Sequence, residues 1–393
     1  MRTLLFCHCR VSRMTNIRVR TLLLAVSLGL LFLQLCKDFN YQVTISLDRK
    51  VSEEDSEVRK PATNKYVYSW PKCERNTSAA KVENFSSLPL LIQDFLYYRH
   101  CRHFPMILDV PDKCGGANKS AEVFLLLVIK SSPVNYERRE VLRKTWAQER
   151  LHNGVQIRRI FISGVTGSGF ERGRQNRLLE LEQNEHNDIL QWDFRDTFYN
   201  LTLKQVLFLE WMERNCPKAR FLLNGDDDVF ANTDNMVEYL QGPRDNNGRK
   251  HLFTGFLVKD TKLDRSVDSK YYVPVQILQR NYYPPYCSGG GFLLSGYTAM
   301  VIYKMSTFVV LIPIDDAYMG MCLDYARLDV FSHIGVKSLG MYIPSKQLDD
   351  SDPCFYKEIL LVHRFLPFQI YLMWHRIHDP NLNCEHTKKS PGE

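Results

Sequence analysis

The stretch FLLNGDDDVF, Phe221 to Phe230, places three consecutive carboxylates after an apolar run typical of a buried strand. These carboxylates are Asp226, Asp227 and Asp228. Loops beyond the carboxyl ends of strands in open α/β sheets form the usual ligand crevice, and oxygen ligands suit Mg²⁺ or Mn²⁺ carrying a pyrophosphate. The alternative is an Asp-rich turn that caps a helix over Val229 to Leu240.

The sequence around this stretch alternates between strand and helix patterns. Apolar runs typical of strands occupy residues 122–132, 157–165 and 188–194, and runs typical of helices occupy residues 136–146, 172–186 and 201–215. Such βα repeats predict an α/β fold with a mainly parallel sheet flanked by helices, in which right-handed crossovers place the strand tips on one side. The three aspartates would then lie at the ligand-binding edge of the sheet.

The second half of the chain has a different texture. After Gly248, short strands and loops replace the long alternating runs, and one helix is expected from Tyr297. No break in composition separates the two halves. We therefore expect one continuous catalytic domain over residues 121–384, followed by a C-terminal tail at 385–393.

The N-terminus has the pattern of a single transmembrane anchor. An uncharged apolar run, Thr21–Cys36, follows a basic tail over residues 1–20. At 1.5 Å per residue the run spans roughly 24 Å, which suits the thinner early secretory membranes, and the positive-inside rule keeps the tail cytosolic and the remaining chain lumenal. A cleaved signal peptide is the alternative, although no small-x-small cleavage site precedes Cys36.

Two segments connect the anchor to the catalytic domain. Residues 37–72 are polar and charged, with little to bury, and are expected to form a lumenal stem. Residues 73–120 contain an apolar segment, Leu88 to Leu108, which predicts a helix that docks on the main domain. Cys101 and Cys114 are expected to pin this docking segment.

Sequons and cysteines support a lumenal location. Eight cysteines follow the anchor, an even number compatible with disulfides, in any of 105 connectivities. Their spacing is irregular and contains no CxxC pair, which argues against a zinc site. Four asparagines are acceptors for N-glycosylation because Ser or Thr follows two residues later. They are Asn76, Asn84, Asn118 and Asn200.

Composition is that of a globular protein. Hydrophobic residues make up 45% and charged residues 24% of the 393-residue chain, which is long enough for an enzyme. The net charge of +7 is not gathered into a basic block interleaved with aromatic residues, so no nucleic-acid partner is expected.

Positive side chains near the first strand suit a diphosphate. Lys130 ends that strand, and Arg138, Arg139 and Arg143 follow on the next predicted helix. The alternative is that these arginines cover a solvated helix face. We favour Lys130 and Arg138 as the residues that bind such a diphosphate.

A glycine run in the second half suits the approach of a sugar. Gly289, Gly290 and Gly291 carry no side chains, so backbone can approach a sugar ring closely. A plain turn is the alternative. Tyrosines nearby offer ring faces on which sugars stack. These are Tyr282, Tyr283 and Tyr286.

Taken together, six motifs occur in the order found in the β1,3-glycosyltransferases of the secretory pathway. The resemblance covers about Leu88 to Cys384 and is greatest to the β1,3-N-acetylglucosaminyltransferases, including those that extend core 1 O-glycans. It implies a GT-A-like fold and an inverting, metal-dependent reaction with a UDP-sugar. The motifs are RREVLRKTWAQER, DTFYNLTLKQ, GDDDVF, YPPYCSGGGFLLS, PIDDAYMGMCL and LVHRF.

This resemblance also implies roles for particular residues. Asp228 and His363 match the two protein ligands of Mn²⁺, for which Mg²⁺ is an alternative, and Asp226 and Asp227 match donor-binding positions, with Asp226 toward the ribose or uracil. Asp316 matches the catalytic base that takes a proton from the acceptor hydroxyl.

Taken from the residues alone, two of these positions have structural alternatives. His363, on an apolar run, is also typical of a hydrogen-bonded core histidine. Asp315 and Asp316 are also typical of a helix N-cap and its neighbour.

The expected function is transfer of GlcNAc from UDP-GlcNAc, in β1,3 linkage and with inversion, to terminal galactose of core 1 O-glycans or N-acetyllactosamine chains. The expected location is the Golgi membrane, in single-pass type II orientation. A β1,3-galactosyltransferase that uses UDP-galactose is the closest alternative, and a catalytically silent lumenal carbohydrate-binding protein is a more distant one. The sequence does not indicate an oligomeric state.

Overall fold

The central sheet is built around β2 (Val123–Lys130), a run of eight buried residues with β-branched and leucine side chains. In this computed structural model the described residues are 34, 70–242, 247–338 and 352–384. Those from 70 onward belong to one unit, Tyr66–Glu393. The sheet has nine strands, in the order β1-β5-β4-β2-β6-β11-β8-β12, with β3 paired to β4.

The four middle strands run parallel, as the sequence predicts. β4 (Val155–Val165) lies between β2 and β5 (Ile189–Arg195), and β6 (Phe221–Asp226) pairs with the other edge of β2. Three helices connect them: α4 (Tyr136–Lys144), α5 (Gly169–His186) and α6 (Leu201–Asn215). The register places Lys130 directly opposite Asp226, so both residues lie at the same strand-tip edge.

The remaining five strands make the sheet mixed. The expectation of a mainly parallel sheet therefore holds for the four middle strands and is wrong for the sheet as a whole. Strand β11 runs antiparallel to β6. The long segment 232–290 precedes it, so the two strands are not joined by the right-handed crossover that connects parallel strands. β8 is antiparallel to β11, and β12 is parallel to β8. β1 pairs antiparallel with β5, and β3 pairs antiparallel with β4. Their bounds are β1 (Met106–Leu108), β3 (Arg150–His152), β8 (Phe253–Gly255), β11 (Gly291–Ser295) and β12 (Phe331–Ser332).

A second, three-stranded sheet brings the C-terminal part of the chain to the aspartate turn. Its order is β13 (Val336–Lys337), β14 (Leu361–His363), β7 (Val229–Ala231). β14 runs antiparallel to β7 and places His363 opposite Val229, directly after the three aspartates. A two-stranded sheet pairs β9 (Leu257–Val258) with β10 (Tyr286–Cys287).

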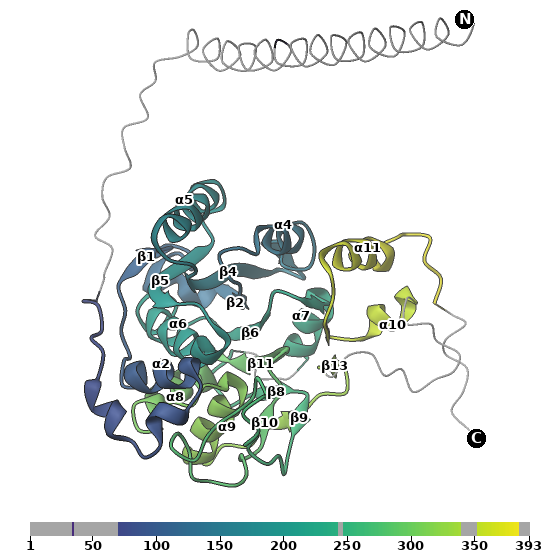
Figure 1. Ribbon diagram of the computed structural model, residues 1–393. Helices are drawn as coiled ribbons and strands as arrows, with labels where there is room; N and C mark the ends of the chain where they lie inside the picture. Colours follow the sequence, from purple (N-terminus) through teal and green to yellow (C-terminus); the bar gives the residue numbers. More distant parts are fainter. Residues whose placement is uncertain (1–33, 35–69, 243–246, 339–351, 385–393) are drawn as a thin grey trace, which may run out of the picture. The chain divides into compact units, whose positions relative to one another are not determined.

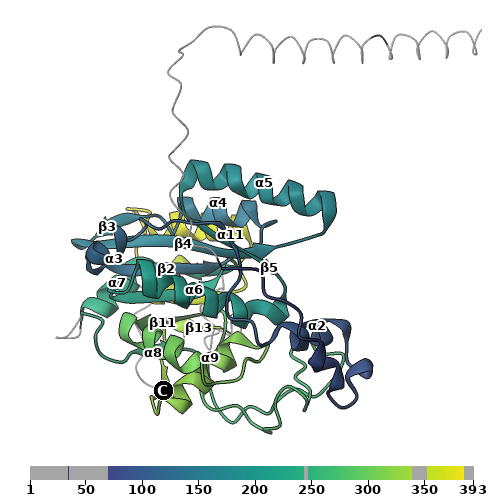
Figure 2. The same ribbon diagram turned by 90° about the vertical axis from the view of Figure 1, so that its left-hand side faces the viewer.

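Helices cover both faces of the central sheet. Figure 2 shows α4, α5 and α11 (Pro367–Ile377) on one side, and α6, α8 (Gly296–Ser306) and α9 (Asp315–Tyr325) on the other. Side chains of β2 alternate between the two cores, with Leu126 and Val128 in one and Leu125 and Leu127 in the other. The other helical segments are η1 (Thr77–Lys81), η2 (Phe85–Ser87), α3 (Gly116–Lys119), η3 (Ser120–Glu122), η4 (Phe198–Asn200), α7 (Thr233–Gln241) and α10 (Pro353–Glu358).

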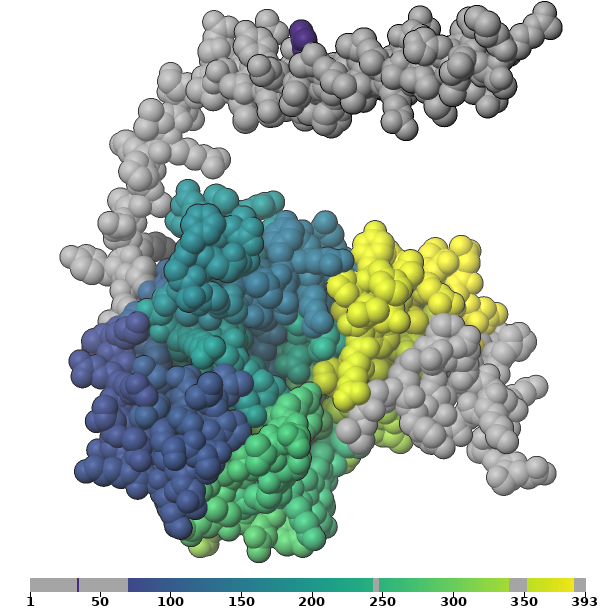
Figure 3. All heavy atoms as spheres, viewed as in Figure 1, coloured from purple at the N-terminus to yellow at the C-terminus, as the bar shows by residue number. Residues whose placement is uncertain are grey.

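The docking segment packs on the main domain as expected, although its helix is shorter than predicted. α2 (Leu90–Tyr98) buries Ile92, Phe95 and Leu96 in one of the cores. The chain beyond it then becomes strand β1, which joins the sheet edge. Figures 1 and 3 show this segment, in dark blue, beside the green segment of the second half.

Three disulfides hold the described part of the chain. Cys73–Cys101 closes the docking segment, Cys114–Cys216 ties it to the end of α6, and Cys354–Cys384 closes the C-terminal part. Cys114 therefore ties the segment to the main domain, whereas Cys101 closes the segment on itself. Two of the eight cysteines, Cys287 and Cys322, are buried thiols.

Two further expectations concern helices. The turn of three aspartates does not cap a helix over Val229 to Leu240, since β7 follows it and the side chain of Asn232 caps α7. The expected anchor at 21–36 lies outside the described residues, apart from position 34. Among the residues that are described, no helix has the length and apolar character needed to span a membrane.

Candidate active site

The three aspartates form the tip of β6 and the turn into β7, where the two sheets meet. The turn is held by the backbone, because Phe365 N donates to Asp228 O (2.8 Å) and Asp226 N donates to Gly290 O (3.3 Å). Each carboxylate has a different environment. Asp226 and Asp228 are partly exposed, whereas Asp227 is only 4% exposed.

Asp226, Asp228 and His363 form a cluster suited to a metal ion. One ligand atom from each residue lies within 4.8 Å of the others, and His363 Nε2 is 3.2 Å from Asp228 Oδ1 and 3.8 Å from Asp226 Oδ2. The second ring nitrogen, Nδ1, lies 3.2 Å from Ser338 O, an arrangement that directs Nε2 toward the carboxylates. Burial opposes the charged imidazolium, but the bond to Asp228 raises the pKa of His363 above its ordinary value.

These residues fit a divalent cation. Burial opposes the charge on Asp228, yet the partner His363 holds the pKa of Asp228 below its ordinary value, so the carboxylate is ionised at neutral pH. Two carboxylates and one imidazole form a mixed oxygen and nitrogen donor set, which suits Mn²⁺ better than the all-oxygen preference of Mg²⁺.

Lys130 is not exposed to solvent, although charged side chains ordinarily are. Its ammonium is buried, with the side chain 3% exposed, and lies 2.9 Å from Asp226 Oδ1 and 2.8 Å from Asp315 Oδ2. It also donates to Gly289 O at 3.3 Å. Burial opposes the charge of this lysine, but Asp226 and Asp315 raise its pKa above the ordinary value. Lys130 thus ties the metal cluster to the start of α9.

We expect Lys130→Met to lower the free energy of unfolding by about 3 kcal/mol, because removing this partner leaves the buried Asp315 and the partly exposed Asp226 without a counter-charge. Urea unfolding of the metal-free protein measures this change. Lys144→Met, on the exposed face of α4, is the matched control. Equal stability of the two variants would show that Lys130 is not needed to neutralise Asp226 and Asp315.

Asp227 is bound by the protein itself. Ser131 Oγ (2.7 Å) and Asn135 Nδ2 (2.8 Å) donate to its Oδ2, and Arg138 Nη1 donates to Oδ1 at 2.8 Å. Arg138 also approaches Asp228 Oδ2 at 3.5 Å, and its side chain stays one-third exposed. Arg138 therefore lies where it can reach an anionic ligand, while Asp227 holds it in place.

Arg139 and Arg143 neither cover a solvated face nor point to the aspartates. Both are buried against Glu182 of α5, and Arg143 also pairs with Asp188 at 2.8 Å. Of the three arginines on α4, only Arg138 lines the pocket.

Asp316 lies in the first turn of α9, whose N-cap residue is Ile314, so neither Asp315 nor Asp316 is the N-cap. Gly289 N donates to Asp316 Oδ2 at 2.9 Å, and Ala317 N donates to Oδ1 at 2.7 Å. Burial and the neighbouring charge of Asp315 raise the pKa of Asp316 to about 7.

The metal cluster and Asp316 line the same pocket, which has a volume of about 600 Å³. One wall holds Arg138, Asp228 and His363, and Asp316 lies at the start of α9 with Gly289. The arrangement combines cation ligands, a positive side chain and a carboxylate with raised pKa. Such a set suits the transfer of a group from a charged leaving group to a hydroxyl acceptor.

Comparison with known proteins identifies the fold family. The family model described as galactosyltransferase matches residues 137–333, half of the chain. The chain belongs to the galactosyltransferase family. It is 52% identical to human N-acetyllactosaminide β-1,3-N-acetylglucosaminyltransferase 3, over 79% of this chain and 82% of the relative. The resemblance drawn from the sequence motifs is therefore confirmed.

Two further relatives have related names. A human acetylgalactosaminyl-O-glycosyl-glycoprotein β-1,3-N-acetylglucosaminyltransferase is 50% identical, over 80% of this chain and 81% of its own length. The mouse UDP-GlcNAc:βGal β-1,3-N-acetylglucosaminyltransferase 7 is 39% identical, over 79% and 77%. The chain is thus a glycosyltransferase of the galactosyltransferase family.

The glycine run of this family member is required by packing within the protein. A Cβ on Gly290 would lie 2.8 Å from His363 Cγ, one on Gly291 would lie 2.4 Å from Leu361 Cδ1, and one on Gly289 would lie 3.2 Å from Asp316 Oδ2. The run lets β14 and the start of α9 approach the same backbone. The glycines therefore bring the predicted metal ligand and the predicted base together.

Several pocket residues were not assigned a role from the sequence. Lys204 is buried and pairs with Asp196 Oδ1 at 2.8 Å, and both line the pocket. Phe198 and Tyr271 meet edge to face, with centroids 5.6 Å apart, and Lys270 Nζ is 4.7 Å from the Tyr271 ring centroid. The sequence signal for Lys204 is a charge among the mostly apolar first residues of α6. The Phe198–Tyr271 pair has no such signal, because it joins distant segments of the chain.

Three tyrosines were expected to stack on sugars, but none of them is among the residues that line the active-site pocket. Tyr283 is buried, Tyr286 is half-buried, and Tyr282 is exposed. Burial and then the charge of Asp316 raise the pKa of Tyr286 to about 12, so this ring lies close to the proposed base and stays neutral.

Proposed function

We propose that this glycosyltransferase moves GlcNAc from UDP-GlcNAc, in β1,3 linkage and with inversion, to a terminal galactose of O-glycans or N-acetyllactosamine chains. The observation that carries the proposal is the single pocket that holds the Asp226–Asp228–His363 cluster together with Asp316. The names of relatives that are 39–52% identical support GlcNAc as the sugar and galactose as the acceptor.

In this proposal Asp228 and His363 hold Mn²⁺, with Asp226 beside them. The bound cation would neutralise the charge that develops on UDP as the donor bond breaks. Arg138, one-third exposed and close to Asp228, would bind a diphosphate oxygen. Lys130 is already paired with two carboxylates, so it orients Asp226 and opposes the effect of burial, which raises the pKa of that carboxyl to about 6.

Asp316 is the proposed base. Two backbone N–H groups fix its carboxylate, and each oxygen retains a lone pair that can accept the proton of the acceptor hydroxyl. As the hydroxyl oxygen bonds to the anomeric carbon, its proton passes to Asp316 and UDP leaves from the opposite face. A pKa near neutrality matches a base that must be ionised before the reaction and protonated after it.

We expect kcat/KM to fall with decreasing pH through an acid limb near neutral pH. The ionised form of Asp316 accepts the proton, and burial with the Asp315 charge raises its pKa to about 7, so activity is lost as pH falls through that value. Initial rates at saturating Mn²⁺ over pH 5–9 measure the limb. A rate that stays constant down to pH 5 would contradict the role of burial, since an ordinary carboxyl loses its proton near pH 4.

The test of the function uses the full chain with UDP-GlcNAc or UDP-galactose on Galβ1,3GalNAc and N-acetyllactosamine acceptors, with Mn²⁺ or with a chelator. Metal-dependent GlcNAc transfer is the expected result. Galactose transfer would instead establish the galactosyltransferase alternative. Binding of acceptors without transfer from either donor would favour a carbohydrate-binding role.

We also propose the Golgi lumen as the location, with an anchor at 21–36, a cytosolic tail at 1–20 and a stem at 37–72. The three disulfides of the described residues support an oxidising compartment. The sequon residues Asn76, Asn84 and Asn118 are exposed and Asn200 is half-buried, which leaves at least the first three open to a glycan.

A further inference from the structure

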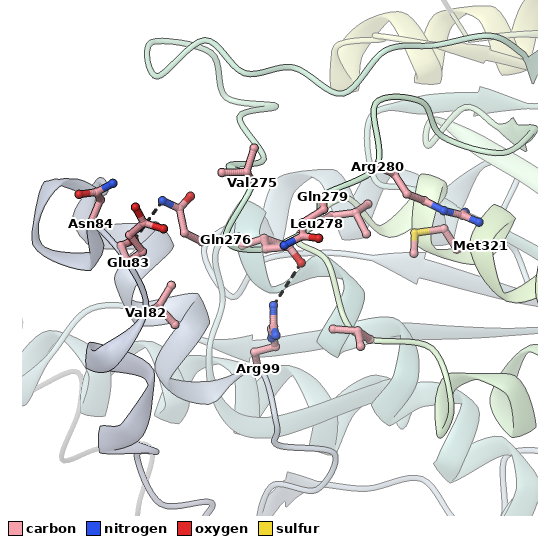
Figure 4. Close-up of a pocket in the computed structure, with 12 residues that line it drawn as sticks. Val82, Glu83, Asn84, Arg99, Val275, Gln276, Leu278, Gln279, Arg280 and Met321 are labelled. Atoms are coloured by element: carbon pink, nitrogen blue, oxygen red, sulfur yellow. Dashed lines mark hydrogen bonds between the residues drawn. The ribbon is translucent and has the colours of Figure 1, made fainter.

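A second groove, of about 670 Å³, lies outside the active site. Figure 4 shows that one side comes from the docking segment, with Val82, Glu83 and Arg99, and the other from the loop 275–280. Only two hydrogen bonds described for these residues cross the groove. Gln276 Nε2 donates to Glu83 O at 3.1 Å, and Arg99 Nη1 donates to Ile277 O at 3.3 Å.

The lining combines exposed alkyl groups with hydrogen-bonding side chains. Val275 is 57% exposed and Val310 is 49% exposed. Gln276, Gln279 and Arg99 supply amide and guanidinium groups along the same groove. A sugar ring has the matching chemistry, since its C–H face covers alkyl groups while its hydroxyls and acetamido group exchange hydrogen bonds with polar side chains.

Asn84, a sequon residue, lines this groove at one end, beside Glu83 and Gln276 (Figure 4). Its backbone is left-handed (φ 55°) and its side chain is exposed. Among the described hydrogen bonds, none involves the Asn84 side-chain amide. By contrast, Asn76 Oδ1 accepts from Ser78 N, and Asn200 Nδ2 donates to Arg195 O.

We propose that the first GlcNAc of an N-glycan on Asn84 lies in this groove and bridges the docking segment to the loop 275–280. The bond joins Asn84 Nδ2 to the anomeric carbon of the sugar; the amide loses one proton, and the lipid diphosphate of the lipid-linked oligosaccharide donor is the leaving group. The sugar covers Val275 and replaces water between the two sides. This inference rests on the proposed lumenal location but not on the proposed sugar transfer.

The bridge has a consequence for the active site. The loop 275–280 continues directly from Lys270 and Tyr271, which line the active-site pocket. Residues 270–278 form no strand, and within the loop 275–280 the described backbone N–H bonds are those of Ile277 and Leu278 to Pro274 O. A sugar fixed in the groove would therefore reduce local opening of the loop 275–280, which follows the active-site pocket residues Lys270 and Tyr271 in the chain.

The test compares the full chain with the Ser86→Ala variant, which removes the sequon but keeps the Asn84 side chain. Ser78→Ala, which removes the neighbouring Asn76 sequon, is the matched control. The proteins are produced in cells that retain high-mannose glycans, so that endoglycosidase H leaves one GlcNAc at each site. Mass spectrometry measures occupancy, and hydrogen exchange measures protection of residues 275–280.

We expect Asn84 to be occupied and the loop to exchange several-fold faster in Ser86→Ala than in the wild type. Trimming to one GlcNAc is expected to leave protection unchanged, and Ser78→Ala is expected to behave as the wild type. The melting temperature of Ser86→Ala should fall by about 2–4 °C. An unmodified Asn84, equal exchange in Ser86→Ala, or loss of protection on trimming would each overturn the proposal.

Discussion

Replacing Asp316 by Asn is expected to lower kcat for sugar transfer by about 10²–10⁴-fold, the usual contribution of a general base. The amide cannot accept the hydroxyl proton, although it has the same shape as the carboxylate. Affinity for UDP with Mn²⁺ should change little, because the metal cluster lies on β6 and β14, and Asp316 begins α9. Steady-state rates and calorimetric titration of UDP measure the two effects separately.

Asp324→Asn is the matched control for this variant, since it changes an exposed aspartate at the other end of the same helix. In the wild type, a backbone N–H group donates to each oxygen of Asp316. In Asp316→Asn the NH₂ group must replace one of these oxygens and face a donor, so a loss of stability of about 1 kcal/mol is also expected. Turnover within a few-fold of the wild type would exclude Asp316 as the base.

Replacing Asp228 by Asn is expected to raise the Kd for Mn²⁺ by more than about 100-fold, because losing a partner in the outer shell of a metal site alone costs 10–100-fold. The variant also removes the carboxylate that raises the pKa of His363. Manganese titration followed by electron paramagnetic resonance measures free and bound ion directly. Activity should recover in part at high Mn²⁺, since the amide oxygen remains a weak ligand.

Asp329→Asn, at an exposed position outside the pocket, controls for the loss of one negative charge. The same variant separates the metal role from the base role. Excess Mn²⁺ should rescue Asp228→Asn but leave Asp316→Asn inactive. Unchanged Mn²⁺ affinity in Asp228→Asn would remove this residue from the metal site.

The strand-and-helix order of the first half follows from local patterns. Apolar runs of β2, β4, β5 and β6, separated by amphipathic helices, predict both the elements and their parallel pairing. The direction of β11 was not predictable in this way. All five of its residues are buried, a pattern that is the same in either direction, and the path of the 232–290 segment decides on which edge and in which sense it pairs.

Charge alone was a poor guide to the role of the basic residues. Lys130 and Arg143 are as basic in sequence as Arg138, yet burial brings Lys130 to Asp226 and Asp315 and brings Arg143 to Glu182 and Asp188. Only Arg138 keeps an exposed guanidinium in the pocket. Pairing of this kind joins residues up to 185 positions apart, which local pattern does not encode.

The sequence by itself determined the α/β character of the first half, the position of the three aspartates at a strand tip, and the membership of the galactosyltransferase family. These properties follow from periodicity and motif order, which are local. The tertiary structure alone decided that His363 meets Asp228, that the glycine run lets His363 and Asp316 share one pocket, and that Lys130 links Asp226 to Asp315. The physical reason is that each of these contacts depends on how distant segments pack, and side-chain packing is fixed only when the whole core closes.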